Sequence, residues 1–384
     1  MRKILIIALL LSLAVGVAAQ DDCGLPENPA LSNKERRLMK ESLDGQLRDW
    51  KIIGATGQQP AITFESIDAT HIVVSSAYEL DGSLAVKNES DYDWARSAAL
   101  WDVTHRLGDI FGMVSALGYD VVLKTTFATG RPQKLFAYDN ATLRRIMALP
   151  STAAVRLYAE AAGVRRDAPY EFDSNIVCTG ASYCDHLFTL NLRVDISPEG
   201  DEFPFPWLDL QVYCAGMLEG SDTRFAAAYD SSAVRIVVDW PGLPVPETFT
   251  FDFPVDRLRS NGTLVDVDSI GRMLASVVNS QCPVVLDSSL TLQSCEYDPS
   301  LQVIVENFSA SELLVVTYEG REDTSRDIIL KVLGENYDTG VMLDALVAVG
   351  LGLEFRLRSR TSFRPATITF TPEDLRFFIE NIMN

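Results

Sequence analysis

The stretch CTGASYCDH contains side chains that can bind a metal ion or form disulfides. It carries Cys178, Cys184 and His186. Structural zinc sites usually have a tighter cysteine pair and a second pair of ligands downstream, and neither occurs in this chain. We therefore predict disulfide chemistry here, with no metal site and no cofactor.

The cysteine count also favours disulfides. An even number of cysteines in an exported chain is typical of a disulfide framework, although their order leaves the connectivity open. Cys282 and Cys295 stand apart in the C-terminal third, so we expect them to pair with each other. Cys23 must then bond into the middle third or stay free. The candidate disulfide residues are Cys23, Cys178, Cys184, Cys214, Cys282 and Cys295.

No residue set in the sequence identifies a catalytic centre. The three histidines are His71, His105 and His186, and only His105 with Asp109 offers part of a Ser-His-Asp triad. No G-x-S-x-G elbow, phosphate-binding glycine loop or H-E-x-x-H motif occurs. Paired carboxylates could serve a glycosidase, but the 53 acidic residues single out no pair. We assign no catalytic residue.

Two short acidic stretches raise the alternative of cation binding. ESDYDW places Asp91 and Asp93 two residues apart, and VDVDS does the same with Asp266 and Asp268. Neither stretch continues into the calcium-loop pattern, which needs a central glycine and a terminal glutamate. The pattern therefore indicates no calcium site.

A row of arginines near the C-terminus reverses the local charge. In LEFRLRSRTSFRP the arginines alternate with Phe355 and Leu357, so on a strand they share the face opposite the core. Guanidinium groups in a row can bind carboxylates, sulfates or phosphates in a bidentate manner. The alternative is pairing with acidic side chains of the same or a neighbouring module. The candidate binding residues are Arg356, Arg358, Arg360 and Arg364.

The overall charge excludes some classes of partner. The chain has 33 basic and 53 acidic residues, a formal net charge of −20. Such a surface repels phosphate backbones and anionic lipids, so we expect neither nucleic-acid binding nor general attraction to membranes.

The N-terminus predicts export. Residues 1–19 have the two basic residues, the apolar run and the small residues of a secretory signal, with cleavage expected after Ala19. An uncleaved membrane anchor is the competing interpretation, but the apolar run is short for a bilayer span. A second apolar run is interrupted by Asp344. We expect a secreted or periplasmic protein without membrane insertion after cleavage.

The remaining chain contains an internal repeat. The strand-like stretch HIVVSSAYE at 71 resembles LFTLNLRVD at 187 and ELLVVTYEG at 312. YDVVLKT at 119 resembles AVRIVVDW at 233 and LEFRLRSR at 353, and ARSAALWDV at 95 resembles SRDIILKVL at 325. A self-similarity with a period of about 117 residues indicates tandem globular modules rather than a solenoid. An alternative is two clear modules around a diverged or unrelated middle.

The predicted modules follow a tail at 20–31 and span 32–149, 150–266 and 267–384, with the middle one the most diverged. Their helices can be placed by apolar spacing: a stripe from Leu100 to Leu117 recurs every three or four residues before Gly118. Thr371, Pro372 and Asp374 form a helix start with a capping box. Strands such as ETFTFDF alternate apolar and polar residues, which predicts one solvated face. The predicted fold is α+β: three modules, each a mainly antiparallel sheet covered by helices on one face.

These features favour an exported, non-catalytic binding or scaffold protein of repeated α+β modules. Its expected partner is an extracellular or periplasmic ligand of unknown identity, and the arginine row suggests an anionic one. The alternatives are a secreted, glycosidase-like hydrolase with carboxylates in a cleft between modules, and a secreted protein inhibitor.

Overall fold

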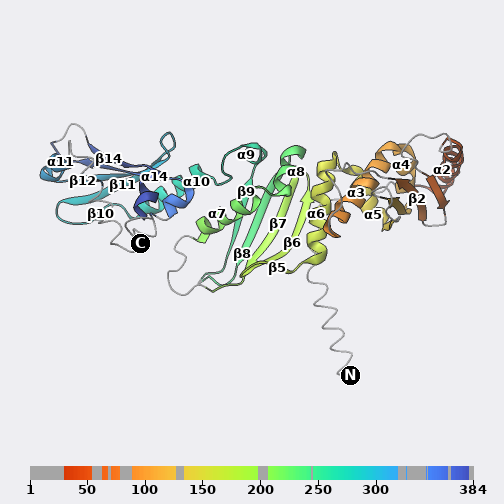
Figure 1. The fold of residues 1–384 in the computed structure, drawn as a ribbon, viewed down its shortest axis with the longest axis horizontal. Helices are drawn as coiled ribbons and strands as arrows, with labels where there is room; N and C mark the ends of the chain where they lie inside the picture. The colour runs from red at the N-terminus through yellow and green to blue at the C-terminus, as the bar shows by residue number, and fades with distance from the viewer. Residues whose placement is uncertain are drawn as a thin grey trace, which may run out of the picture. The chain divides into compact units, whose positions relative to one another are not determined.

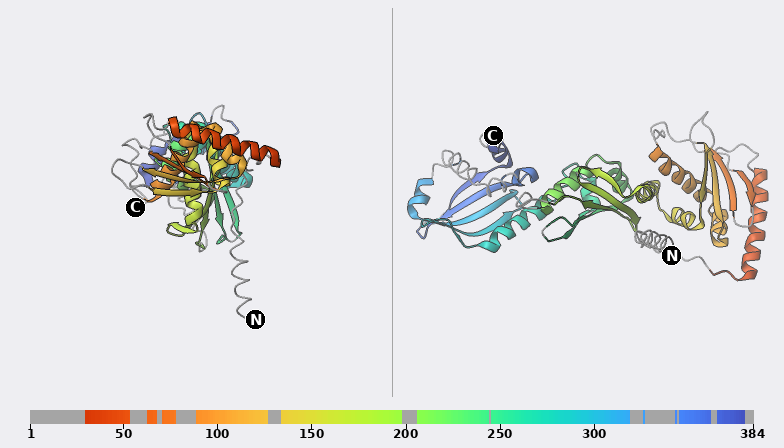
Figure 2. Two further views of the ribbon diagram at one scale, coloured as in Figure 1. Left: turned by 90° about the vertical axis from the view of Figure 1, so that its right-hand side faces the viewer. Right: turned by 90° about the horizontal axis from the view of Figure 1, so that it is seen from below.

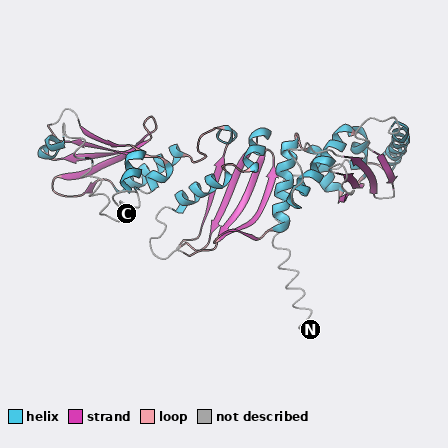
Figure 3. Cartoon of the chain, viewed as in Figure 1, coloured by secondary structure: helices cyan, strands magenta, loops and turns pink. Residues whose placement is uncertain are grey.

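The structure is a computed structural model of the chain. It describes residues 30–53, 63–67, 71–77, 89–126, 134–197, 206–243, 245–318, 326, 343, 345–361 and 365–379. The expected signal peptide, residues 20–29 of the tail and Arg364 lie outside these ranges. Along the described chain, helices alternate with strands that form three separate sheets (Figure 3).

The first module contains a four-stranded sheet in the order β1-β2-β3-β4. β2 and β3 are parallel, and each has an antiparallel partner on its outer side. The crossover between them runs through α3 and α4, whose residues Val103, Phe111 and Val114 pack with Val121 and Leu123 in one core. α2, drawn in red, packs beside β1 (Figure 2). The elements are α2 (Asn33–Ile53), β1 (Thr63–Ile67), β2 (His71–Ala77), α3 (Glu89–Arg106), α4 (Gly108–Leu117), β3 (Asp120–Thr126), β4 (Lys134–Tyr138) and α5 (Asn140–Ala148).

The second module contains a five-stranded sheet in the order β5-β6-β7-β8-β9 (Figure 1). Its central pair, β7 and β8, is parallel, and the other pairs are antiparallel. Every second residue of β7 and β8 is buried while those between are more exposed, so only one face carries the core. The elements are α6 (Thr152–Asp167), β5 (Tyr170–Asp173), β6 (Ile176–Cys184), β7 (Leu187–Val194), α7 (Pro206–Leu218), α8 (Asp222–Asp230), β8 (Ala233–Trp240), β9 (Glu247–Phe253) and α9 (Val255–Arg259).

The third module repeats this arrangement in a sheet ordered β10-β11-β12-β13-β14. β12 and β13 form the parallel pair. Phe355 of β13 contacts Phe308 of β12 and Phe370 of β14 edge to face in the core. The elements are α10 (Val267–Gln281), β10 (Val284–Val285), β11 (Leu290–Asp298), β12 (Val303–Ala310), α11 (Glu312–Tyr318), β13 (Gly352–Arg358), β14 (Ala366–Phe370) and α14 (Pro372–Phe378).

All three sheets share a core of four strands with the same topology, and the second and third add one strand at an edge. This confirms the predicted α+β fold in modules. In each, the central parallel pair is aligned so that its first residues face each other: His71 with Asp120, Leu187 with Ala233, and Val303 with Gly352. The first strands of these pairs begin at residues 71, 187 and 303, which are equally spaced. Each second strand is followed by an antiparallel strand and a helix.

The predicted position of one repeated strand is wrong. ELLVVTYEG was expected to match the strands at 71 and 187, but residues 312–318 form helix α11, and β12 at 303–310 occupies the equivalent place. Ser311 starts the helix, since its Oγ accepts the Leu314 N–H at 3.3 Å. Within α11, Val315 is buried while Leu313 and Val316 are exposed, a helical rather than a strand pattern. Of the related stretch at 325–333, only Arg326 is described.

Several predicted helix boundaries are confirmed. Thr371 and Asp374 form the capping box of α14, with Pro372 in its first turn. Gly118 ends α4 in the left-handed conformation, with φ of 78°. The apolar stripe is buried from Leu100 to Leu117, although the helix is interrupted at Leu107 into α3 and α4. The sequence EGSD separates α7 from α8.

The chain forms two compact units, each with its own core. The described residues of Met1–Ser197 and Gly220–Asn261 form the first, and those of Pro198–Glu219 and Gly262–Asn384 form the second. α7 therefore belongs to the second unit, where Leu208 lies in the core of the third sheet. No described helix is long and apolar enough to span a membrane.

Candidate functional site

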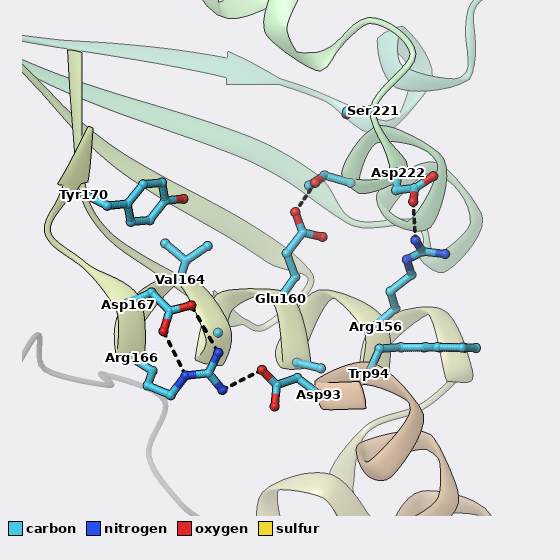
Figure 4. A pocket seen from close by; sticks show the side chains of 13 residues that line it. Asp93, Trp94, Arg156, Glu160, Val164, Arg166, Asp167, Tyr170, Ser221 and Asp222 are labelled. Atoms are coloured by element: carbon cyan, nitrogen blue, oxygen red, sulfur yellow. Dashed lines mark hydrogen bonds and ion pairs between the residues drawn. The ribbon is translucent and has the colours of Figure 1, made fainter. Parts of the chain in front are cut away.

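A pocket of about 600 Å³ lies in the first unit, where α3 of the first module meets α6 and α8 of the second (Figure 4). We call it the junction pocket. Its volume is within the range of small-molecule sites. Its lining residues are Asp93, Trp94, Arg156, Ala159, Glu160, Gly163, Val164, Arg166, Asp167, Tyr170, Ser221, Asp222 and Thr223.

Helix caps fix the two helices of the second module that line the junction pocket. Ser151 precedes α6, and its side chain accepts the Ala154 N–H at 3.0 Å. Ser221 precedes α8, and its side chain accepts the Arg224 N–H at 3.1 Å. Because Ser221 also lines the pocket, the start of α8 forms part of the wall. Leu157 of α6 is fully buried.

Arg166 joins α6 to α3 at one end of the junction pocket. Its guanidinium binds Asp93 at 2.5 Å and Asp167 through two bonds of 2.9 and 3.1 Å. Arg96 approaches the other Asp93 oxygen at 2.9 Å. The hydrogen bonds to Asp167 and Asp93 raise the pKa of Arg166, so it stays charged. This end of the pocket is therefore internally neutralised.

Arg156 joins α6 to α8 at the other end. It forms an ion pair with Asp222, and its guanidinium lies 5.7 Å from the centre of the Trp94 ring. A cation at this distance from an indole face is attracted by the ring. Trp94 Nε1 is buried and has no acceptor among the described residues.

Glu160 points from α6 toward the start of α8, between these two ion-paired ends (Figure 4). It accepts a hydrogen bond from the Thr223 hydroxyl, and no described cation forms an ion pair with it. Burial raises the pKa of Glu160 above its ordinary value, while Thr223 and Arg156 act against the rise and Asp222 adds to it. Glu160 is thus the one pocket carboxyl within the described chain that lacks a cationic partner.

Tyr170 closes the pocket from the start of β5, and its ring points into the same space (Figure 4). Burial, with a hydrogen bond to Cys178, raises the pKa of its hydroxyl. Tyr170 is therefore a neutral group that supplies an aromatic surface and a hydroxyl. No cluster of described His, Cys, Asp and Glu side chains could hold a metal ion. The arrangement suits recognition of a small polar molecule.

The arginine row of the third module is partly engaged within its own sheet. Arg356 bonds to Glu354 at 2.6 Å and to Glu296 at 3.3 Å. Arg358 ends β13 and is exposed, and Arg360 is exposed beyond the strand. Phe355 and Leu357 are buried in the core, on the opposite face as expected. Anion binding by Arg356, Arg358, Arg360 and Arg364 stays a prediction.

Replacing Arg356 by methionine should destabilise the third module by about 2 kcal/mol, because Glu354 would keep only one partner in a buried position. The Glu354 side chain is 6% exposed and would retain only the Thr369 hydroxyl at 3.0 Å. The Arg356 side chain is itself 30% exposed, so we expect a smaller loss of stability than for a fully buried ion pair. Urea unfolding measures the change. The matched Arg358→Met variant should change stability by under about 0.5 kcal/mol, and equal losses in both would contradict the pairing argument.

The cysteines form fewer disulfides than expected. Cys184 is disulfide-bonded, whereas the other described cysteines, Cys178, Cys214, Cys282 and Cys295, are free. The expected Cys282–Cys295 pair is therefore wrong. Cys282 follows α10, where its thiol contacts the Val278 carbonyl at 3.5 Å, and Cys295 is buried in the core. Burial raises the pKa of Cys214 and of Cys295 to about 12, so both are protonated core groups. Cys23 lies outside the described residues.

The described histidines form no catalytic triad. His105 is exposed, its Nδ1 lies 2.9 Å from the Trp101 carbonyl, and its ring stacks on Trp101. His186 lies 3.4 Å from Asp230, in the turn between β6 and β7. Asp230 accepts hydrogen bonds from the hydroxyl groups of Ser151, Tyr183 and Ser232.

The junction pocket escaped prediction from the sequence. Asp93 and Trp94 fall in ESDYDW, which was considered only as a calcium loop. Glu160 and Arg166 lie in α6, whose sequence carries no recognisable functional motif. Only the register of α6 against α3 and α8 brings these residues together.

Known proteins with a similar sequence or structure give no functional assignment for this chain. No protein-family model matches the sequence, and no curated protein matches it. The crystal structure of a candidate secreted protein from Pseudomonas aeruginosa is similar over 29% of this chain and 94% of its own, with 12% identity and a TM-score of 0.24. A likeness at this score supports no conclusion about function.

Proposed function

We propose that this chain is an exported, non-catalytic binding protein built of repeated α+β modules, and that its ligand occupies the junction pocket. The observation that carries the proposal is a pocket of about 600 Å³ in which Glu160, Trp94 and Tyr170 converge from three elements. Such pockets, with a few polar groups beside aromatic walls, are the usual form of small-molecule sites.

The state of the acidic residues favours binding over catalysis. Asp93, Asp167 and Asp222 each bond to an arginine, so their oxygens are already engaged. A general acid and base must exchange protons with the substrate. Among the carboxyl groups that line the pocket, Glu160 alone has no arginine partner in the described part of the chain. A single such carboxyl suffices to hold a ligand.

A hydrolase is the second candidate, and one observation favours it. Glu160 is a carboxyl whose pKa is raised, mainly by burial, and Asp222 lines the same pocket. A protonated carboxylic acid beside an ionised carboxylate is the pairing used by glycosidases. A binding protein would release the bound molecule unchanged, whereas a hydrolase would release it cleaved.

Narrowing the pocket should abolish binding. Val164 lines the pocket from α6, so Val164→Phe would place a ring in the cavity. We expect a saturation-transfer NMR screen of amino acids, monosaccharides, amines and carboxylates to find a ligand with a Kd of about 1 mM or tighter. The Val164→Phe variant should weaken it by at least about tenfold, a loss of roughly 1.4 kcal/mol.

The control is Val277→Phe, which makes the same change on α10 at a residue that is 41% exposed. It should leave binding unchanged. Absence of any ligand, or equal binding by both variants, would contradict the proposal. Recovery of the ligand in cleaved form would favour the hydrolase instead.

A further inference from the structure

The charges that line the junction pocket do not balance. Four carboxyl groups face two guanidinium groups. Arg166 is shared by Asp93 and Asp167, and Arg156 is bound to Asp222. Arg96, which lies outside the lining, also binds Asp93. Every pocket carboxyl except Glu160 therefore has a guanidinium partner among the described residues.

We propose that the ligand carries an ammonium group that binds Glu160 in the junction pocket. This inference rests on the proposed binding function and names the chemical class of the ligand. An ammonium supplies the positive charge that Glu160 lacks, and three N–H donors can reach its carboxylate. The oxygen Oε1 already accepts the Thr223 hydroxyl, which orients the carboxyl and leaves the second oxygen to the ligand.

The other walls suit the same ligand. Trp94 already has Arg156 near its face, and an indole beside carboxylates is a favourable setting for organic cations. Tyr170 adds a second aromatic ring, and its hydroxyl is a neutral polar group. The matching features are therefore an ammonium group at Glu160 and a neutral remainder of the ligand.

Other ligand classes fit less well. An anion would enter a lining with twice as many carboxyl groups as guanidinium groups, within a chain of formal net charge −20. A neutral polyol could form hydrogen bonds but would leave Glu160 without a counter-charge. The balance of charge therefore favours a cation.

The class is tested with three compounds that differ at one end only: 5-aminopentan-1-ol, pentane-1,5-diol and 5-hydroxypentanoate. Binding is measured by saturation-transfer NMR at physiological ionic strength, which screens diffuse attraction to the acidic surface. We expect the amine to bind and the diol and the carboxylate to bind at least about tenfold more weakly.

Two isosteric variants locate the bound amine. Glu160→Gln keeps a partner for Thr223 but removes the negative charge, and should weaken amine binding at least about tenfold. Glu247→Gln makes the same change at an exposed residue of β9 and should have no effect. Amine affinity should also rise with pH in the original protein as Glu160 loses its proton, and this dependence should be absent in Glu160→Gln.

Each outcome decides the matter. Amine binding that is insensitive to Glu160→Gln would overturn the proposal, since it would reflect the general acidic surface. Preferential binding of the diol or the carboxylate, lost in Val164→Phe, would overturn the ammonium class and leave the binding function standing. If no compound here or in the wider screen binds, both proposals fail.

Discussion

The Asp230→Ala variant is expected to lose about 4 kcal/mol of stability, because several buried hydroxyls would lose a charged acceptor together. The Asp230 side chain is 2% exposed. It accepts hydrogen bonds of 2.5 Å from Ser151, Tyr183 and Ser232. Ser151 also caps α6, so the loss extends to the helix that lines the junction pocket. Urea unfolding followed by tryptophan fluorescence measures the change.

The loss should depend on pH in a defined direction. Burial acts to raise the pKa of Asp230, but the hydroxyls of Ser151, Ser232 and Tyr183, with His186, hold it below its ordinary value. A depressed folded-state pKa gives stability that is present above the unfolded value of about 3.9 and is lost as the pH falls below it. The difference between the original protein and Asp230→Ala should thus persist at neutral pH and shrink in acid.

The exposed Asp256 of α9 provides the matched control. Asp256→Ala should cost under about 1 kcal/mol, because an exposed charge contributes little. A small loss for Asp230→Ala, or a difference that grows in acid, would show that the hydroxyl bonds do not stabilise the fold as argued.

The Gly242→Ala variant should lose about 3 kcal/mol, because an added methyl group has no space. Its Cβ would lie 2.1 Å from the Ile196 carbonyl oxygen and 2.9 Å from its carbon. That same oxygen accepts the Trp240 indole N–H at 2.8 Å, and Trp240 is 3% exposed. Relieving the clash therefore breaks a buried hydrogen bond. A thermal unfolding scan, with the Trp240 fluorescence maximum as a local probe, measures both effects.

The control for this substitution is Gly112→Ala. Gly112 lies within α4, and an added Cβ would have no atom within 4 Å. Because alanine favours the helix more than glycine, this variant should gain about 0.5–1 kcal/mol. Opposite signs for the two variants are expected; two losses of similar size would mean that the contact with Ile196 is not the cause.

The sequence allowed prediction of those elements whose determinants are local. The capping box at Thr371 and the end of α4 at Gly118 depend on neighbouring residues, and both are confirmed. The alternation in β9 also holds, with Phe249 and Phe253 buried. Such signals are sufficient because they act within a few residues of the chain.

The errors arose where tertiary context decides. The segment at 312–318 is rich in leucine and valine, which suits a strand, yet β12 occupies the strand position beside β13 and this segment forms α11. Cys282 and Cys295 were paired because they are isolated in sequence, although one follows a helix and the other lies in the core. The junction pocket was missed for the same reason: Glu160 differs from other glutamates only through what surrounds it in the folded chain.

The central strands of each sheet have a consequence for the order of folding. β1 with β2 and β3 with β4 are antiparallel and lie close in sequence, so each pair can form early. β2 and β3 meet only after the chain containing α3 and α4 has been brought across the sheet. Closing that long connection costs conformational entropy, and core contacts offset this cost only after the two strands have paired. Because the crossover recurs in every module, assembly of the parallel pair should set the folding rate of each one.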